Sequence, residues 1–211
     1  MNDVDIDFEL KQPEHAPLLI VISGPSGIGK DTVVLGMKKR KLPFHFVITA
    51  TSRLPRENEV PGVDYFFYSE ETFEKMIADG EFLEYAWVYT NYKGVPKSQV
   101  QKALDSGKDV VMRLDVQGAQ TVHGLCPDAI MVFLTAKSKE EWVQRLRDRR
   151  SETNEELAVR IKTAKAEYET LDIFDYIVAN EEGKLDETLD IIESIIEAEH
   201  HRVNPRRVHF E

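Results

Sequence analysis

The sequence predicts an α/β domain built on a parallel sheet, with a smaller inserted lobe and a helical lid. Short apolar runs at 18–22, 110–112, 130–134 and 176–178 alternate with helical patterns. Near-continuous apolar runs of this kind are typical of strands covered on both faces. Residues 50–95 follow a different rhythm of strands and turns, which indicates the insertion.

The first elements are a strand at 18–22, a glycine-rich turn and a helix at 31–41. A second buried strand is expected at 46–48. In the inserted segment, strands at 64–68 and 81–87 flank an amphipathic helix at 70–78, which ends at Asp79-Gly80.

The remaining helices are expected at 96–105, with a proline near its first turn, at 138–150, at 154–171 and at 184–201. The capping box Thr153-x-x-Glu156 separates the two charged helices of the lid. The tail at 202–211 is expected to be loose.

Composition excludes several classes of protein. The 211 residues suffice for one domain, and 27 lysine and arginine residues against 38 aspartate and glutamate residues give a net charge of -11. That charge disfavours binding to nucleic acid and to anionic membranes. No apolar run reaches the ~20 residues of a membrane span. One cysteine, Cys126, and the absence of an Asn-x-Ser/Thr acceptor indicate an intracellular protein.

The turn after the first strand reads Gly-Pro-Ser-Gly-Ile-Gly-Lys at 24–30 and predicts a nucleoside-triphosphate site. Its glycines let backbone N–H groups face a polyphosphate, and Lys30 reaches the terminal phosphates. The alternative is an ordinary glycine turn, which the spacing, the lysine and the flanking strand and helix disfavour. The residues assigned to ATP here are Gly24, Ser26, Gly27, Ile28, Gly29, Lys30, Asp31 and Thr32.

Asp31 departs from the motif, which places Ser or Thr after the lysine to bind Mg²⁺. Thr32 comes one residue late. We expect an intact phosphate cradle in which Asp31 orders Mg²⁺, directly or through its waters.

A turn-rich segment carries Arg53, Arg56 and then Tyr65, which together can hold one phosphate. An arginine pair in a loop is, by itself, more often solvated surface charge. Phosphoryl transfer, however, depends on positioning and on cations around the migrating group, so further arginines favour it. They follow the later strands at Arg145, Arg149, Arg150 and Arg160.

These motifs together resemble the guanylate kinases over about residues 17–198. The resemblance rests on the phosphate loop, on Thr-Ser-Arg-x-x-Arg-x-x-Glu-x-x-Gly-x-Asp-Tyr at 51–65, on Glu-Phe-Leu-Glu-Tyr-Ala at 81–86, on Asp-Val-Gln-Gly at 115–118, on the arginine-rich lid and on Ile-Val-Ala-Asn at 177–180. Asp31 and the segments 91–97 and 113–115 further resemble the organellar branch found in plant plastids.

The resemblance implies that Arg53, Arg56 and Tyr65 hold the GMP phosphate. It implies that Thr49, Glu84 and Asp115 read guanine. Two carboxylates can accept from the adjacent ring N–H and exocyclic amine of guanine, whereas adenine has no donor at those positions. The alternative for Glu84 is an exposed acid on a strand.

The same resemblance implies that cations surround the transferred phosphoryl group and that Asn180 contacts the adenine of ATP. The residues assigned to transfer are Lys30, Arg53, Arg149 and Arg160.

Two further positions depart from the family pattern. Lys93-Gly94-Val95 stands where Tyr-Gly-Ser or Tyr-Gly-Thr is common near the acceptor phosphate, which removes a hydroxyl and adds a cation. Arg113 stands where an acid usually helps to hold the water shell of the metal. Because Asp31 and Arg113 both fall at the carboxyl edge of the sheet, we expect them within salt-bridge or one-water distance.

We therefore predict a P-loop nucleoside monophosphate kinase of one domain, 1–211, that transfers the γ-phosphoryl group of ATP to GMP and dGMP, giving ADP and GDP, with Mg²⁺. Its core is expected at about 17–49, 96–137 and 166–201, its GMP-binding lobe at about 50–95 and its lid at about 138–165. A non-catalytic guanylate-kinase-like module that binds phosphopeptides is the alternative, which the intact loop disfavours. A kinase for phosphorylated sugars would not need Glu84 and Asp115.

We expect a monomer that binds neither nucleic acid nor membrane. The resemblance suggests a plastid, or also a mitochondrion, with the cytoplasm as the alternative, and the acidic start is not a transit peptide. Cys126 and Trp87 are expected to be packing residues. His200 and His201 are adjacent, so a helix would point them apart and a metal site is not expected there.

Overall fold

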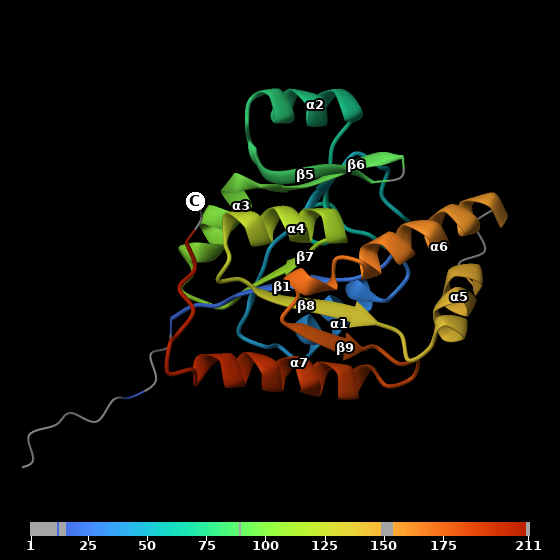
Figure 1. Cartoon of the computed structure of the whole chain (residues 1–211). Helices are drawn as coiled ribbons and strands as arrows, with labels where there is room; N and C mark the ends of the chain where they lie inside the picture. The colour runs from blue at the N-terminus through green and yellow to red at the C-terminus, as the bar shows by residue number, and fades with distance from the viewer. Residues whose placement is uncertain (1–11, 13–15, 89, 149–153, 210–211) are drawn as a thin grey trace, which may run out of the picture.

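The computed structural model describes residues 12, 16–88, 90–148 and 154–209 and has the predicted α/β core (Figure 1). Its larger sheet has the strand order β2-β7-β1-β8-β9, and each neighbouring pair is parallel. The strands are β1 (Leu19–Ser23), β2 (His45–Phe46), β7 (Val110–Arg113), β8 (Ile130–Thr135) and β9 (Tyr176–Ala179).

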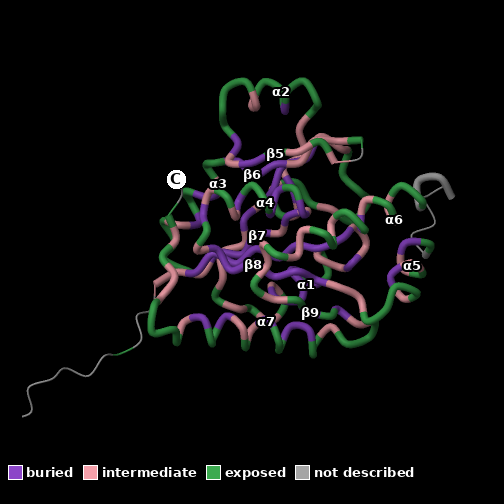
Figure 2. Tube along the Cα trace, in the orientation of Figure 1, coloured by how far each residue is buried: buried purple, intermediate pink, exposed green. Residues whose placement is uncertain are grey.

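Helices cover both faces of this sheet. The side chains of Ile20 and Ile22 pack into a core with α1 (Lys30–Lys39) and α7 (Leu185–His200). Those of Leu19 and Val21 pack into a second core with α3 (Lys97–Leu104) and α4 (Val116–Leu125). The central strands are accordingly buried in Figure 2, which explains their uninterrupted apolar sequences.

A second sheet, of order β4-β3-β6-β5, lies above the core in Figure 1. It consists of β3 (Ala50–Thr51), β4 (Phe66–Phe67), β5 (Phe82–Val88) and β6 (Asn91–Pro96). Helix α2 (Glu70–Ala78) begins after Ser69, whose side chain accepts from the N–H of Thr72, and packs on the sheet through Phe73. The Phe73 ring stacks on Phe82 with 4.3 Å between ring centroids.

Two further helices, α5 (Lys139–Asp148) and α6 (Asn154–Tyr168), follow β8, and a 3-10 turn (Leu171–Ile173) precedes β9. The indole N–H of Trp142 donates to the carbonyl of Ser26 at 2.9 Å, which holds α5 against the glycine-rich loop. The predicted capping residue Thr153 lies outside the described residues, as does the side chain of its partner Glu156.

Helix α4 and strand β6 are among the elements that were not expected from the sequence. Helix α4 begins directly after Asp115 despite two glycines, because the Asp115 carboxylate accepts from the N–H of Gly118 and caps it. Strand β6 contains Gly94 and Pro96, which are poor strand residues, and pairing with β3 and β5 overrides that preference. The predicted strand at 46–48 is shorter and lies at His45–Phe46.

The prediction of a loose tail is wrong for its middle part. Arg206 lies 2.9 Å from a Glu199 carboxylate oxygen and 3.0 Å from one of Asp175, and Val208 packs against the second core. Trp87 is also not a core residue, because it is 47% exposed. Cys126 is fully buried among apolar side chains, as its packing role requires.

Candidate active site

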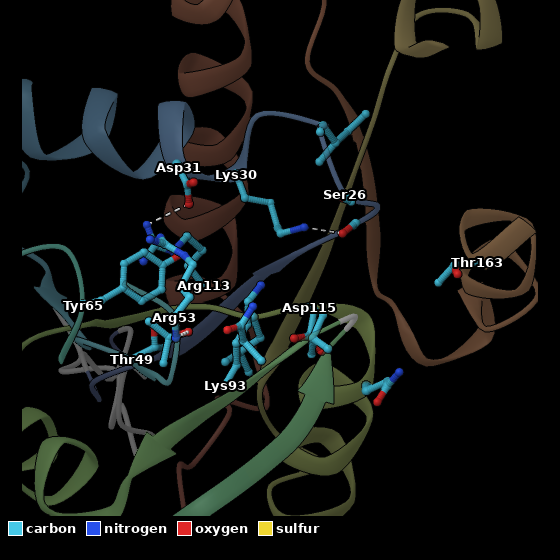
Figure 3. Close-up of a pocket in the computed structure, with 18 of the residues that line it drawn as sticks. Ser26, Lys30, Asp31, Thr49, Arg53, Tyr65, Lys93, Arg113, Asp115 and Thr163 are labelled. Atoms are coloured by element: carbon cyan, nitrogen blue, oxygen red, sulfur yellow. Dashed lines mark hydrogen bonds and ion pairs between the residues drawn. The ribbon is translucent and has the colours of Figure 1, made fainter. Parts of the chain in front are cut away.

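A cavity of about 530 Å³ opens at the carboxyl edge of the large sheet, between the glycine-rich loop, the second sheet and α6 (Figure 3). Parallel α/β sheets collect their ligands at this edge. With the exception of Asn180, the predicted site residues that the structure describes all line it. They are Gly24, Ser26, Gly27, Ile28, Gly29, Lys30, Asp31, Thr32, Thr49, Arg53, Arg56, Tyr65, Glu84, Asp115 and Arg160.

The glycine-rich loop joins the buried strand β1 to α1. Gly24 has a φ of 134°, and a Cβ at this position would lie 2.4 Å from the carbonyl oxygen of Leu134 on the neighbouring strand. Only glycine therefore permits the turn. Helix α1 begins at Lys30, so the N–H groups of its first turn and the loop face the cavity in the arrangement that binds phosphate.

The Lys30 ammonium folds back on the loop, where it donates to the carbonyl oxygens of Gly24 and Pro25. Burial, and then the nearby Lys93, lower the pKa of Lys30 to about 8, while Glu167, Asp115 and Asp31 oppose the shift. A desolvated cation with only carbonyl acceptors is suited to an anionic ligand.

The predicted pair of Asp31 and Arg113 is confirmed. A guanidinium nitrogen of Arg113 lies 2.8 Å from a carboxylate oxygen of Asp31 (Figure 3). Arg113 also lies over the Tyr65 ring, 4.4 Å from its centroid, and donates to the carbonyl oxygen of Asp64 at 3.1 Å. These contacts fix the Arg113 guanidinium on the cavity wall.

Arg53 is held by two parallel hydrogen bonds to the Glu59 carboxylate, at 2.7 and 2.6 Å. Its guanidinium also lies 5.0 Å from the centroid of the Tyr65 ring. Arg56 is more loosely placed, with 3.8 Å to Glu59 and a side chain that is 62% exposed. Glu59 was part of the recognised motif, but its role in orienting Arg53 emerges only from the structure.

Glu84 is a buried carboxyl group on β5, 6% exposed, which rules out the exposed strand acid considered above. Burial, and then the nearby Asp115 carboxylate, raise the pKa of Glu84 to about 8, whereas Lys93 opposes the shift. The Glu84 carboxylate rests on Gly118, where a Cβ would lie 2.9 Å from one of its oxygens. Helix α4 thus positions both acids: Asp115 caps its N-terminus, and the Glu84 carboxylate packs against its Gly118.

Thr49 adds an unpaired polar group to the wall of the cavity. The residue is 5% exposed, and its hydroxyl oxygen is buried without a hydrogen-bond partner in the described structure. Buried polar groups are nearly always paired, so an orphaned hydroxyl on a cavity wall points to a ligand contact.

Helix α6 presents one face to the cavity through Arg160, Thr163 and Glu167, which are three or four residues apart. Arg160 donates to the Ser26 hydroxyl at 2.6 Å, so the lid helix contacts the phosphate loop. Thr163 and Glu167 were missed in the sequence, although their helical spacing from Arg160 is a usable signal. Arg149 lies outside the described residues.

Asn180 lies against the phosphate loop and does not line the cavity among the described residues. Its side chain is 6% exposed and donates to the carbonyl oxygen of Ile28 at 2.9 Å, while its own carbonyl accepts from Thr188 at 3.3 Å. Asn180 therefore braces the phosphate loop from behind. Arg145 makes a similar brace, because it donates to the carbonyl oxygen of Asn180 at 2.6 Å. The adenine contact of Asn180 that the resemblance implies stays a prediction.

Among the described helices, none is long and apolar enough to cross a membrane.

Comparisons with known proteins agree with this geometry. The guanylate kinase family model matches residues 17–199. A protein of Oryza sativa subsp. japonica named guanylate kinase 2, chloroplastic/mitochondrial, is 46% identical over 199 residues, which cover 94% of this chain and 70% of the relative. Guanylate kinase of Bacillus subtilis (strain 168) is 43% identical over 193 residues, covering 90% and 94%.

The crystal structure of guanylate kinase from Anaplasma phagocytophilum superimposes with a TM-score of 0.73 at 27% identity, covering 89% of this chain and 88% of the other. The family model spans most of the chain, and the two curated relatives exceed 40% identity over nearly all of it. The chain therefore belongs to the guanylate kinase family.

Proposed function

We propose that the chain is an ATP:GMP phosphotransferase, which transfers the γ-phosphoryl group of ATP to GMP and gives ADP and GDP. The proposal rests on one observation: a single cavity contains both a phosphate-binding loop and a pair of acids that can bind a base. A phosphate loop with Lys30 forms one end, and the buried Glu84 with the half-buried Asp115 forms the other. Membership of the guanylate kinase family, and relatives that carry this name, support the same activity.

The acid end suits guanine. Guanine places a ring N–H beside an exocyclic amine, so Glu84 and Asp115 can each accept one of these donors, and the Thr49 hydroxyl can pair with a further base atom. Adenine has no hydrogen at its ring nitrogen, which would leave a buried carboxylate unpaired at a cost of about 1–3 kcal/mol or more. The site therefore favours GMP over AMP.

The acceptor phosphate is assigned to Arg53, Arg56 and Tyr65. The Glu59 carboxylate fixes the guanidinium of Arg53 before any ligand arrives, so little side-chain freedom is lost on binding. The Arg56 side chain is exposed, and its guanidinium lies 3.8 Å from the Glu59 carboxylate, so it can move over the phosphate after GMP binds.

Transfer of the phosphoryl group needs cations around the migrating group, and Lys30, Arg53, Arg149 and Arg160 are assigned to this task. Lys30 would exchange the carbonyl oxygens of Gly24 and Pro25 for ATP phosphate oxygens. The contact of Arg160 with Ser26 already brings α6 to the phosphate loop. Cations held in place in this way stabilise the developing charge without reorganisation during the reaction.

The residues present also fit Mg²⁺ as the metal that accompanies ATP. Mg²⁺ is usually held by substrate phosphates and one or two carboxylates, with water completing its shell. Within the described part of the chain no cluster of three or more histidine, cysteine or acidic side chains could hold a metal alone. Asp31, 52% exposed at the start of α1, is the acid that would hold the metal or its waters, and Mg²⁺ would supply charge neutralisation between the phosphates.

We assign residues of about 50–95 to a GMP-binding lobe and residues of about 138–165 to a lid, on a core of about 17–49, 96–137 and 166–201. The second sheet and α6 both contribute side chains to the lining of the cavity. Closure of both over the substrates would exclude water, which could otherwise accept the phosphoryl group. We also propose that the chain acts as a monomer.

The plastid or mitochondrial location that the sequence suggested is supported by the name of the rice relative, chloroplastic/mitochondrial. The bacterial relative of comparable identity keeps the cytoplasmic alternative open.

A coupled ADP-release assay with GMP, dGMP, AMP, CMP, UMP and a hexose phosphate as acceptors tests the activity. We expect ADP release with GMP and dGMP and its loss in Lys30→Met. Binding of a phosphopeptide with no ADP release from any acceptor would instead support the non-catalytic module. Release with the hexose phosphate alone would support the sugar kinase.

A further inference from the structure

Glu167 is an acid on the cavity wall to which the proposed function assigns no role. It follows Arg160 and Thr163 along the face of α6 that lines the cavity. One of its carboxylate oxygens, Oε2, is buried and has no hydrogen-bond partner among the described residues. A buried carboxylate oxygen without a donor is costly, so on a cavity wall it indicates a ligand that carries one.

The end of α6 that carries Glu167 is fixed to the core. The Tyr168 ring meets the ring of Phe133 on β8 edge-on, with 5.2 Å between centroids, and its hydroxyl lies 2.6 Å from that of Thr135. The Thr170 hydroxyl donates to the backbone carbonyl oxygen of Glu167 at 2.8 Å. Because this backbone is already ordered, a ligand contact at Glu167 costs little further conformational freedom.

Charged neighbours locate the Glu167 carboxylate within the cavity. Burial raises the pKa of Glu167, Lys30 opposes this shift, Asp115 adds to it and Lys93 opposes it. The carboxylate therefore lies near the lysine of the phosphate loop and near the acid assigned to the base.

The groups of the acceptor nucleotide decide which donor Glu167 can receive. The phosphate is negatively charged and would be repelled by a carboxylate. The two adjacent N–H donors of guanine are assigned to Glu84 and Asp115. The remaining donors of GMP are the ribose hydroxyls, and the ribose lies between the base and the phosphate. A ribose hydroxyl is therefore the group that fits.

We infer that Glu167 accepts a hydrogen bond from a ribose hydroxyl of the acceptor nucleotide and is a specificity-determining residue for the sugar. This inference rests on the proposed function and adds to it the recognition of a third part of the substrate. A deoxy analogue of GMP keeps its base and phosphate contacts, so it remains an acceptor. It binds less tightly than GMP when it lacks the hydroxyl that Glu167 receives, because a hydrogen bond to an ionised group is about twice as strong as a neutral one.

A different role for Glu167 would be internal, as a counter-charge for Lys30 that never contacts the acceptor. The two roles differ in their effect on nucleotides that vary only in the sugar. A counter-charge alters the binding of GMP and of its deoxy analogues by equal factors, whereas a ribose contact alters their ratio.

The test compares the affinity of GMP with those of 2′-deoxy-GMP and 3′-deoxy-GMP, measured by calorimetry on the full chain for the wild type and for Glu167→Met. Base and phosphate are common to the three ligands, so their contributions cancel in the ratios. In the wild type we expect GMP to bind more tightly than one of the two analogues by about tenfold or more, the scale of a hydrogen bond to a charged group. In Glu167→Met that preference should disappear.

Glu169→Met is the matched control, since it removes an exposed acid just after the end of α6, and it should keep the wild-type ratios. The ratio of ATP affinity to 2′-deoxy-ATP affinity should be the same in all three proteins. A change confined to this ratio would place the contact on the donor nucleotide and overturn the inference.

Equal binding of GMP and both analogues by the wild type, or a preference that a folded Glu167→Met variant retains, would also overturn the inference. Should Glu167→Met fail to fold, Glu167→Gln keeps the shape of the side chain and removes its charge. The preference should then weaken, and an unchanged preference would count against the contact. Failure of the proposed function has a separate signature, because the wild type would then bind none of the three guanine nucleotides.

Discussion

The Asp31 carboxylate lies 2.8 Å from the Arg113 guanidinium and joins the first turn of α1 to the end of β7. Asp31 places a negative charge beside a loop that is to bind a triphosphate, which would repel the ligand at short range. Arg113 offsets that charge and leaves the Asp31 carboxylate available to metal or water on its exposed side. The pattern that the resemblance implies has a hydroxyl after the lysine and an acid at the end of the strand, whereas this chain has an acid after the lysine and a cation at the end of the strand.

The pair can be tested by exchange. Arg113→Asp alone should lower kcat/KM sharply, because two acids would then face the triphosphate. The double variant Asp31→Ser with Arg113→Asp should recover much of the activity by rebuilding the common arrangement of hydroxyl and acid. Arg113 also contacts Tyr65 and Asp64, so the recovery is judged against Arg113→Asp and not against the wild type.

The Mg²⁺ concentration that gives half-maximal ATP binding is a second readout for the same variants. It should rise in Arg113→Asp and fall again in the double variant. A double variant no better than Arg113→Asp in both readouts would contradict the role assigned to the pair.

Base selection is the second prediction. Glu84→Gln and Asp115→Asn should each lower kcat/KM for GMP by about 2 to 4 kcal/mol in transition-state free energy. The KM for ATP should change little. Asparagine caps helices about as well as aspartate, so Asp115→Asn preserves the start of α4. Wild-type GMP kinetics in both variants would contradict the assignment of these acids.

Gly118→Ala should impair GMP use without unfolding the chain. The added Cβ would lie 2.9 Å from a Glu84 carboxylate oxygen and would displace it. Alanine favours a helix by about 1 kcal/mol over glycine, so stability itself should not suffer from the helix. Gly124→Ala is the matched control, since a Cβ there meets nothing within 4 Å. Kinetics and thermal melts of the two variants, measured side by side, check the prediction, and equal GMP kinetics would refute it.

The raised pKa of Glu84 predicts a pH dependence of base binding. Below about 8 the free carboxyl group holds a proton, which guanine must displace before both acids can accept its donors. Guanosine affinity should therefore fall as the pH decreases, by up to about tenfold per pH unit. Calorimetry with guanosine avoids titration of a ligand phosphate. In Glu84→Gln the affinity should be lower and nearly independent of pH over this range, and a parallel slope would argue against Glu84 as the titrating group.

The fifth prediction concerns the two arginines assigned to the lid, Arg149 and Arg160. Arg160→Ala and Arg149→Ala should each lower kcat on the scale of about 10³-fold, because these cations are assigned to charge that develops during transfer. Lys162→Ala changes an exposed residue of the same helix and should leave kcat unchanged. Thermal melts separate a kinetic loss from unfolding. Unchanged turnover in a folded Arg160→Ala variant would refute its role.

Much of the core could be predicted because its signals are local. The apolar runs of β1, β7 and β8 indicate strands that are buried on both faces. The glycines and the lysine of the loop indicate a turn whose backbone N–H groups can surround a phosphate. The proximity of Asp31 and Arg113 followed from the rule that parallel strands end at one edge.

The remainder depends on contacts between distant residues. Three contacts could be seen only in the folded chain. Glu59 accepts hydrogen bonds from Arg53, the Glu84 carboxylate packs against Gly118, and Asn180 donates to the carbonyl oxygen of Ile28 in the phosphate loop. Composition gave no sign that Arg206 would find two carboxylates on other elements and dock the tail. For Asn180, the family motif indicated the nucleotide site, whereas its hydrogen bonds to Ile28 and Thr188 appear only in the folded chain.

The most direct test of the central claim is an internal competition in which equimolar GMP and AMP compete for limiting ATP and Mg²⁺, with all nucleotides resolved by chromatography. The ratio of GDP formed to AMP consumed gives the ratio of kcat/KM values. We predict GDP formation with AMP left intact, and loss of this preference in Glu84→Gln. Consumption of AMP at a rate equal to that of GMP, or a preference that Glu84→Gln leaves untouched, would contradict the account.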